Sequence, residues 1–217
     1  MPKNNLSLKN IVSIFGSWSK AQEILFLLQG LKDVVRHGFY DFELKAVEEF
    51  CTVNSVCLVK SKFRVVLDKS IETTGKFSNL GLNASNENDK NGMLMVYLSK
   101  DEEKAHLAAY YEHTNNQKEL GLILGYPACC VDYFCQNFSA SNSNPEINSD
   151  NIFTNLAHRE KDCVLISHFP CRSDCPESIV LGKKNLELLQ ELEPKRAEKV
   201  LIILKKTNDL KNTNNFK

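Results

Sequence analysis

Two cysteine-rich segments in the second half of the chain constrain its fold more than any other feature. Residues 125–135 read GYPACCVDYFC, and residues 168–178 read HFPCRSDCPES. Together they supply soft sulfur ligands, one imidazole and two predicted helix starts. This combination suits a metal site, an iron–sulfur site or reactive thiol chemistry, so we expect the fold to bring the two segments together.

Composition places these cysteines in a chain that can bury a sizeable core. The chain has 217 residues, of which 42% are hydrophobic and eight are cysteine. No secretory signal follows Met1, and the longest apolar runs are far shorter than the roughly 20 residues of a membrane span. We therefore expect a cytoplasmic protein outside the membrane. Structural disulfides are rare in that compartment, which favours metal ligation or thiol chemistry for the cysteines.

The charge balance argues against general binding to nucleic acid. Lysine and arginine number 27, as do aspartate and glutamate, so the formal net charge is zero. The lysines between Lys183 and Lys206 alternate with glutamates, a pattern typical of a solvated helix face. We predict no strong nonspecific binding to DNA, and leave local recognition of a structured RNA open.

Hydrophobic periodicity predicts mixed structure in the first half. The expected elements are one or two helices over 7–31, a short helix over 41–51, a hairpin of strands 55–59 and 63–67, a loop over 76–92, and a buried strand over 93–99.

The second half is predicted to be mostly helical. The expected elements are helices over 101–113 and 117–124, a helix from the first cysteines to about 138, a loop over 139–150, a strand or extended arm over 164–167, a helix from about 175, and a last helix over 194–204. Pro127 is expected in a first turn, and Asp174 with Glu177 has the form of a capping box.

These elements give an α+β fold with a small few-stranded sheet in the N-terminal half. We divide the chain into an α+β region over 1–115, a helical region over 116–206 that carries the cysteines and histidine, and a frayed polar tail over 207–217.

The preferred functional hypothesis is a shared metal site. His168, Cys171 and Cys175 have the spacing H-x2-C-x3-C, and Cys129 or Cys130 supplies a further sulfur. Helix starts at these cysteines favour the thiolate that binds metal. Three sulfurs and an imidazole make a structural zinc shell, whereas three sulfurs with an open position suit a catalytic zinc or an iron–sulfur cluster. Because adjacent cysteines seldom both bind one ion, we expect a single ligand from the pair.

A metal-free thiol enzyme, acting by nucleophilic attack or redox exchange, is the first alternative. In the nucleophilic version Cys130 attacks, His168 is the base, and Asp132 or Asp174 orients it.

Neighbouring side chains suggest further roles. Arg172 would hold an anionic group of an unknown small-molecule substrate, and Tyr126 would wall a binding pocket. A solvated arginine and a core tyrosine are the simpler interpretations. A third hypothesis is a purely structural zinc module in an RNA-associated or protein-interaction domain.

The other cysteines and histidines are interpreted without a function. Cys51, Cys57 and Cys135 are expected in the core as small hydrophobic side chains, and Cys163 is undecided. Surface or capping positions are expected for the remaining histidines, His37, His106, His113 and His158.

The two segments resemble the largely archaeal family named domain of unknown function 483. Its members share a G-Y-P-x-C-C segment and a later H-x-P-C-x-x-x-C-x-x-S segment. The matching positions are Gly125, Tyr126, Pro127, Cys129, Cys130, His168, Pro170, Cys171, Cys175 and Ser178. The resemblance extends firmly over 118–189. It implies that the two segments work as one unit, and it implies no particular activity.

Overall fold

The α+β architecture predicted from the sequence is confirmed. The structure is a computed structural model that describes residues 7–67, 81–83, 92–139, 142 and 144–214. In chain order the first-half elements are α1 (Leu8–Phe15), α2 (Trp18–Leu28), β1 (Val34–Phe39), α3 (Asp41–Val53), β2 (Cys57–Leu67), β3 (Gly81–Asn83), β4 (Met93–Ser99) and α4 (Glu102–His113). The second half holds α5 (Gln117–Ile123), α6 (Ala128–Asn137), the short 3₁₀ helix η1 (Arg159–Lys161), α7 (Pro176–Leu192) and α8 (Pro194–Asn214).

The four strands form one antiparallel sheet in the order β1-β4-β2-β3. The predicted hairpin is wrong, because its two runs belong to the single strand β2. The pairing of β2 with β4 shifts register between Lys60 and Arg64. There the backbone N–H of Met95 donates to Ser61 Oγ at 3.0 Å. The polar residues between the two runs therefore form an irregular, bulge-like part of strand β2 and do not make a turn.

Strand β1 was missed at the sequence level because Arg36 and His37 interrupt its apolar pattern. Its ends, Val34 and Phe39, are fully buried. The His37 side chain is only 11% exposed and lies 3.2 Å from the Glu23 carboxylate. The prediction of a surface histidine at this position is therefore wrong, because β1 carries it under α2.

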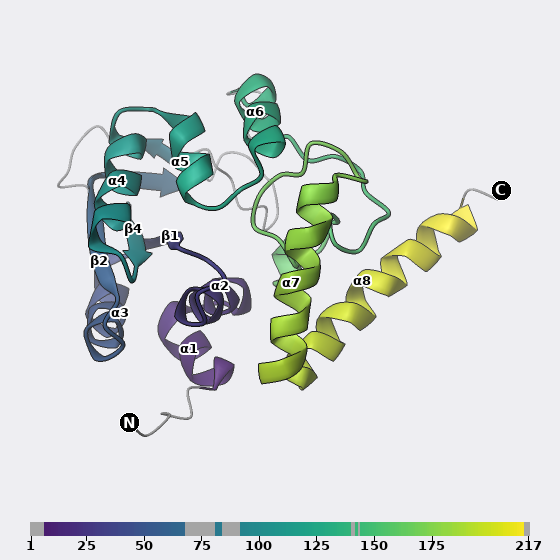
Figure 1. Cartoon of the computed structure of the whole chain (residues 1–217), viewed down its shortest axis with the longest axis horizontal. Coiled ribbons are helices and arrows are strands. Elements are labelled where there is room, and N and C mark those ends of the chain that lie inside the picture. Colours follow the sequence, from purple (N-terminus) through teal and green to yellow (C-terminus); the bar gives the residue numbers. More distant parts are fainter. Residues whose placement is uncertain (1–6, 68–80, 84–91, 140–141, 143, 215–217) are drawn as a thin grey trace.

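Alternate residues of β4 point into two separate packing layers, as the pleat of a strand requires. Val96 and Leu98 face the larger core with α1, α2 and α3, whereas Met95 and Tyr97 face α4 and α5. Figure 1 shows α4 and α5 over one face of the sheet and α1 and α2 below the other. The sheet is thus covered on both faces, and its order places β4 in the interior.

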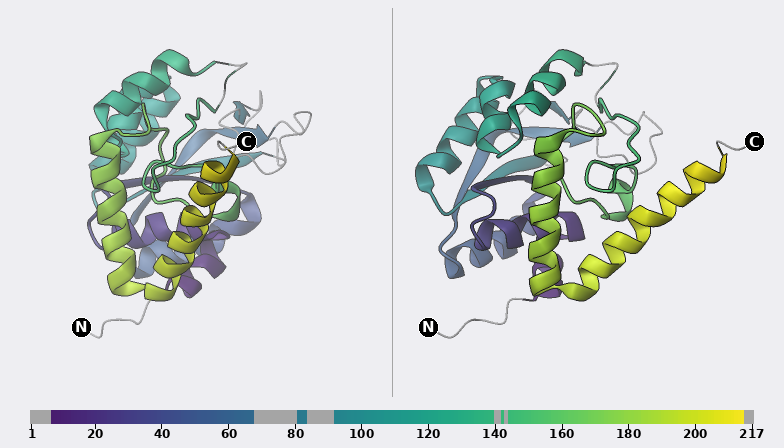
Figure 2. Two further views of the ribbon diagram at one scale, coloured as in Figure 1. Left: turned by 90° about the vertical axis from the view of Figure 1, so that its right-hand side faces the viewer. Right: turned by 45° about the vertical axis from the view of Figure 1, so that its right-hand side comes forward.

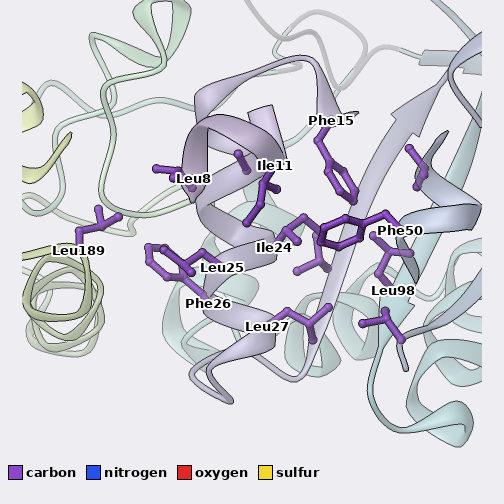
Figure 3. Close-up of a cluster of buried hydrophobic side chains, with 14 of the residues drawn as sticks. Leu8, Ile11, Phe15, Ile24, Leu25, Phe26, Leu27, Phe50, Leu98 and Leu189 are labelled. Atoms are coloured by element: carbon purple, nitrogen blue, oxygen red, sulfur yellow. The ribbon is translucent and has the colours of Figure 1, made fainter. Parts of the chain in front are cut away.

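One hydrophobic core joins the two halves of the chain. Phe15 contacts Phe39 and Phe50 edge-to-face at centroid distances of 5.8 and 5.1 Å. Leu189 of α7 and Leu98 of β4 belong to the same buried cluster. Figure 3 shows the α1 and α2 side chains filling the space between these elements. The core therefore continues across residue 115, where we divide the chain.

Residues 164–166 are buried and form no strand, which leaves the arm of the two predicted alternatives for this segment. The C-terminal part differs from expectation in its last helix. The last helix, α8, continues to Asn214 instead of ending near residue 204, and it diverges from α7 (Figure 2). Within the described ranges, no single helix is both long and apolar enough to cross a membrane. The pair α1 and α2, bent by 120°, meets that length and composition test together.

Candidate metal centre

The first pair of cysteines lies in the opening turn of α6. Gly125 has φ of 78°, a left-handed conformation that glycine adopts without strain, and it lets the chain reverse after α5. Pro127 occupies the N-cap position, one residue earlier than predicted, and α6 begins at Ala128. Cys129 and Cys130 follow at once, and Cys130 is buried while Cys129 is exposed.

Of the second pair, Cys171 lies in the arm before α7 and Cys175 lies at the start of α7, where the predicted capping box is wrong. Cys175, not Asp174, occupies the N-cap position, and no side chain caps the helix. Glu177 instead turns towards the sulfurs, with Oε2 at 3.4 Å from Cys175 Sγ and 3.7 Å from Cys129 Sγ. Because the N-cap is one residue later than predicted, Cys175 lies at the N-terminal end of α7.

Sulfurs from the two segments converge, as predicted, and four cysteines take part instead of three. Cys129 Sγ lies 3.8 Å from Cys130 Sγ and 3.7 Å from Cys175 Sγ, and the Cys130 and Cys175 sulfurs are 3.6 Å apart. With Cys171, all four sulfurs lie within 4.8 Å of one another. We expected only one cysteine of the adjacent pair at the site, but the structure brings both into the cluster.

His168 lies behind this cluster and is not a member of it, contrary to our expectation. Its Nε2 is 2.8 Å from Ser178 Oγ, and that hydroxyl is 3.2 Å from Cys130 Sγ. Ser178 is fully buried and His168 is 4% exposed. The imidazole therefore reaches the sulfurs only through a hydroxyl. The sequence pattern contains Ser178 but gave no reason to assign it this role.

Electrostatics in the cluster depart from the expectation that every cysteine at a helix start becomes a thiolate. Burial raises the pKa of Cys130 to about 11, and partial burial together with the neighbouring sulfurs raises the pKa of Cys129. Burial opposes ionisation of Cys175 as well, but hydrogen bonds from the Ser178 hydroxyl and backbone N–H outweigh it and lower its pKa. Its neighbours therefore assist the ionisation of Cys175, whereas burial opposes that of Cys130.

The other side chains proposed for catalysis lie at the surface. Asp132 pairs with Lys118 of α5 at 2.8 Å, and Arg172 pairs with Asp174 at 3.3 Å. The nucleophile scheme required Asp132 or Asp174 to orient His168, but each has a different ionic partner. Tyr126, the predicted pocket wall, is half-buried, and its ring centroid lies 5.3 Å from that of His168.

The remaining cysteines lie outside the cluster. Cys51 is buried and Cys57 half-buried, as expected for core positions. Cys163 is buried, 3.9 Å from Arg196 Nη1. Cys135 is exposed near the end of α6, so its predicted core position is wrong. Among the described residues, these four take no part in any group of three or more metal-ligating side chains.

Comparison with protein-family models, with curated proteins and with solved structures gives no match for this chain. The resemblance to domain of unknown function 483 therefore stays a prediction that rests on the two motifs. The cysteine cluster is the feature of this fold with a recognisable chemistry.

Proposed function

We propose that Cys129, Cys130, Cys171 and Cys175 bind one zinc ion. The observation that carries this proposal is the spacing of the sulfurs. A tetrahedral shell with zinc–sulfur bonds of about 2.3 Å separates its sulfurs by about 3.8 Å. Three sulfur–sulfur distances of 3.6 to 3.8 Å agree with that value.

The same spacing favours a single ion over an iron–sulfur cluster with several irons. In such a cluster the cysteine thiolates bind different irons, so they stand farther apart than ligands that share one ion. All four sulfurs here lie within 4.8 Å. A mononuclear iron site would share the zinc geometry, and metal analysis separates the two.

Hydrogen-bond donors around the sulfurs support a shell of thiolates. Four thiolates and one zinc ion carry a net charge of −2, which neighbouring donors must offset. The backbone N–H of Cys171 donates to Cys130 Sγ at 3.4 Å, and the Ser178 hydroxyl lies 3.2 Å from the same sulfur. Donors of this kind orient ligands and tune their basicity in metal sites.

The proposed role of the zinc is structural. Four protein sulfurs fill a tetrahedral shell, whereas catalytic zinc keeps a position for water or substrate. The ligands come from the start of α6, the arm before α7, and the N-cap of α7. One ion would therefore fix two helices and a long connection whose described residues form only one named helix, the short η1. Both motifs of the proposed 483-family membership contribute ligands, which agrees with their acting as one unit.

The test is metal content combined with ligand substitution. Protein purified without chelator is expected to contain about one zinc per chain and to show no iron absorption. Cys171→Ser and Cys175→Ser should each lose zinc and lower the melting temperature, because binding energy at a structural site is also folding energy. Cys135→Ser, on the same α6 helix but exposed, is the matched control and should keep both.

A metal-free thiol enzyme is the second candidate. The exposure of Cys129 and the lowered pKa of Cys175 favour it. It requires one cysteine to react rapidly with iodoacetamide in protein that contains no metal, and the loss of that cysteine to leave stability unchanged. This pair of results would replace the zinc proposal.

A further inference from the structure

A groove lies beside the elbow at which α8 follows α7. Its volume is about 360 Å³, and its walls include Gln190 of α7 and Pro194, Glu198, Leu201, Ile202 and Lys205 of α8. Figure 2 shows how α8 diverges from α7 beyond this elbow. We call this surface the elbow groove. It contains no cysteine and takes no part in the zinc proposal.

The middle of α8 is apolar on every side. Residues 200–204 read VLIIL, and a run of this length goes all the way round a helix of about 3.6 residues per turn. Val200 and Leu204 face the hydrophobic core and are fully buried. Ile202 faces the other way and is 46% exposed. Because a helix that is apolar all round is normally covered all round, we expect a partner over the outer side of α8.

Two opposite charges flank the apolar middle of the elbow groove. Glu198 lies one turn before Ile202, and Lys205 lies one turn after Leu201, so all four share one side of α8. Glu198 and Lys205 are exposed, and among the described residues neither forms an ion pair. The groove therefore has an acidic side chain towards the elbow and a basic one at its far end.

This pattern is complementary to itself when two copies of α8 run in opposite directions. About a two-fold axis between residues 201 and 202, Glu198 of each copy lies opposite Lys205 of the other, and Leu201 lies opposite Ile202. If the two helices ran parallel and in register, like charges would meet at both positions. A two-fold dimer uses the same surface on both copies, so it requires a self-complementary surface of this kind.

We propose that the elbow groove is the interface of a symmetric homodimer, in which the α8 helices of two copies pack antiparallel. Leu201 and Ile202 of each copy cover the exposed apolar side of the other α8, and this burial supplies the driving force. The two ion pairs between Glu198 and Lys205 fix the direction of packing. They add little affinity, because exposed ion pairs are weak.

The first test measures the mass of the intact protein by analytical ultracentrifugation over a range of concentrations. We expect a reversible equilibrium between monomer and dimer. Glu198→Lys and Lys205→Glu should each weaken dimerisation at least about tenfold, because each change sets two pairs of like charges opposite one another. Glu103→Lys, a charge reversal at an exposed position of α4, is the matched control and should dimerise like the wild type.

Mixing the two charge-reversed variants tests the antiparallel direction. The Glu198→Lys chain carries lysine at both positions, and the Lys205→Glu chain carries glutamate at both. One chain of each kind therefore restores both ion pairs. We expect an equimolar mixture to form a heterodimer at concentrations where neither variant dimerises alone. A mixture that dimerises no better than the separate variants overturns the proposal.

Two further outcomes also overturn it. A wild type that stays monomeric at every concentration would leave the elbow groove to a helix of another protein. Ile202→Gln, which keeps both charges and removes the exposed apolar side chain, should also weaken dimerisation, and a dimer that this change leaves unaffected does not use the groove. The Ile202→Gln result decides if a charge-reversed variant fails to fold, as checked by circular dichroism.

Discussion

At the scale of single residues, neighbours decide what each titratable side chain does. His168 has a ligand's spacing from Cys171, yet its Nε2 is used by Ser178. Under the zinc proposal Cys130 is a thiolate, and a chain of donors from His168 Nε2–H through the Ser178 hydroxyl to Cys130 Sγ then places the imidazole proton on Nε2. In that proposal the imidazole would orient a sulfur ligand and would not replace one.

Glu23 provides a pH-dependent test at this scale. Its burial works to raise the pKa, but Lys32 and His37 outweigh that effect and lower it from 4.5 to about 2. Between these values the unfolded chain binds a proton that the folded chain does not. Stability from Glu23 is therefore complete above about pH 4.5 and is lost as the pH falls towards 2.

We expect Glu23→Gln to lower the free energy of unfolding at pH 7 by about 3 kcal/mol, because it leaves Lys32 without its buried partner. The difference from wild type should shrink as the pH falls from 4.5 to 2. Urea unfolding at a series of pH values measures it. Glu49→Gln, in an exposed pair with Lys45, is the control and should change little. A wild-type minus Glu23→Gln difference that is independent of pH would contradict the assignment.

At the scale of elements, the contact between α5 and α6 sets the position of the first two cysteines. Gly121 of α5 is buried against Val131 of α6, the residue after Cys130. A Cβ at position 121 would lie 2.8 Å from Val131 Cγ2, closer than real Cβ atoms approach. The missing side chain thus lets α6 approach α5 and brings Cys130 towards α7.

Gly121→Ala is expected to destabilise the protein by about 1 kcal/mol. Overpacking costs about 1–3 kcal/mol, and the better helix propensity of alanine returns up to about 1 kcal/mol. Val131→Ala should destabilise on its own by leaving a cavity. The double variant should lose at least about 1 kcal/mol less than the sum of the single variants, as measured by denaturant unfolding. Additive losses would show that these two side chains do not meet.

At the scale of the whole molecule, both halves of the chain share one hydrophobic core, and positive and negative charges are equal in number. Residues from α1, α2, α3, β4, α7 and α8 share a single buried cluster. The net charge of zero gives no long-range attraction to phosphate backbones. We therefore propose that any nucleic-acid partner is recognised locally, by shape.

A gel-shift titration with random duplex DNA and with bulk tRNA tests this proposal at low and physiological salt. We expect duplex DNA to bind no tighter than about 10⁻⁶ M at physiological salt, because few phosphates can be neutralised together. Tight, salt-resistant duplex binding would contradict the charge argument. Selective tRNA binding would instead support the RNA-associated version of the zinc hypothesis.

The sequence by itself determined most helices, the strand at 93–99 and the convergence of the two cysteine segments. These features depend on local periodicity, on turn residues such as Gly125, and on sulfur chemistry, all of which can be read from neighbours in the chain. The same local signals failed where polar residues interrupt a strand. Arg36 and His37 hid β1, and residues 60–62 suggested a turn within β2.

Only the tertiary structure decided which side chains share a site. Helix α7 starts one residue later than predicted, so Cys175 is its N-cap. The packing of α6 against α5 places both Cys129 and Cys130 in the cluster with Cys171 and Cys175. The same packing places His168 against Ser178, Lys32 against Ser167 and Arg159 against Phe169. These outcomes depend on contacts between residues far apart in sequence, whose distances are set by the packing of whole elements and not by the local pattern of either segment.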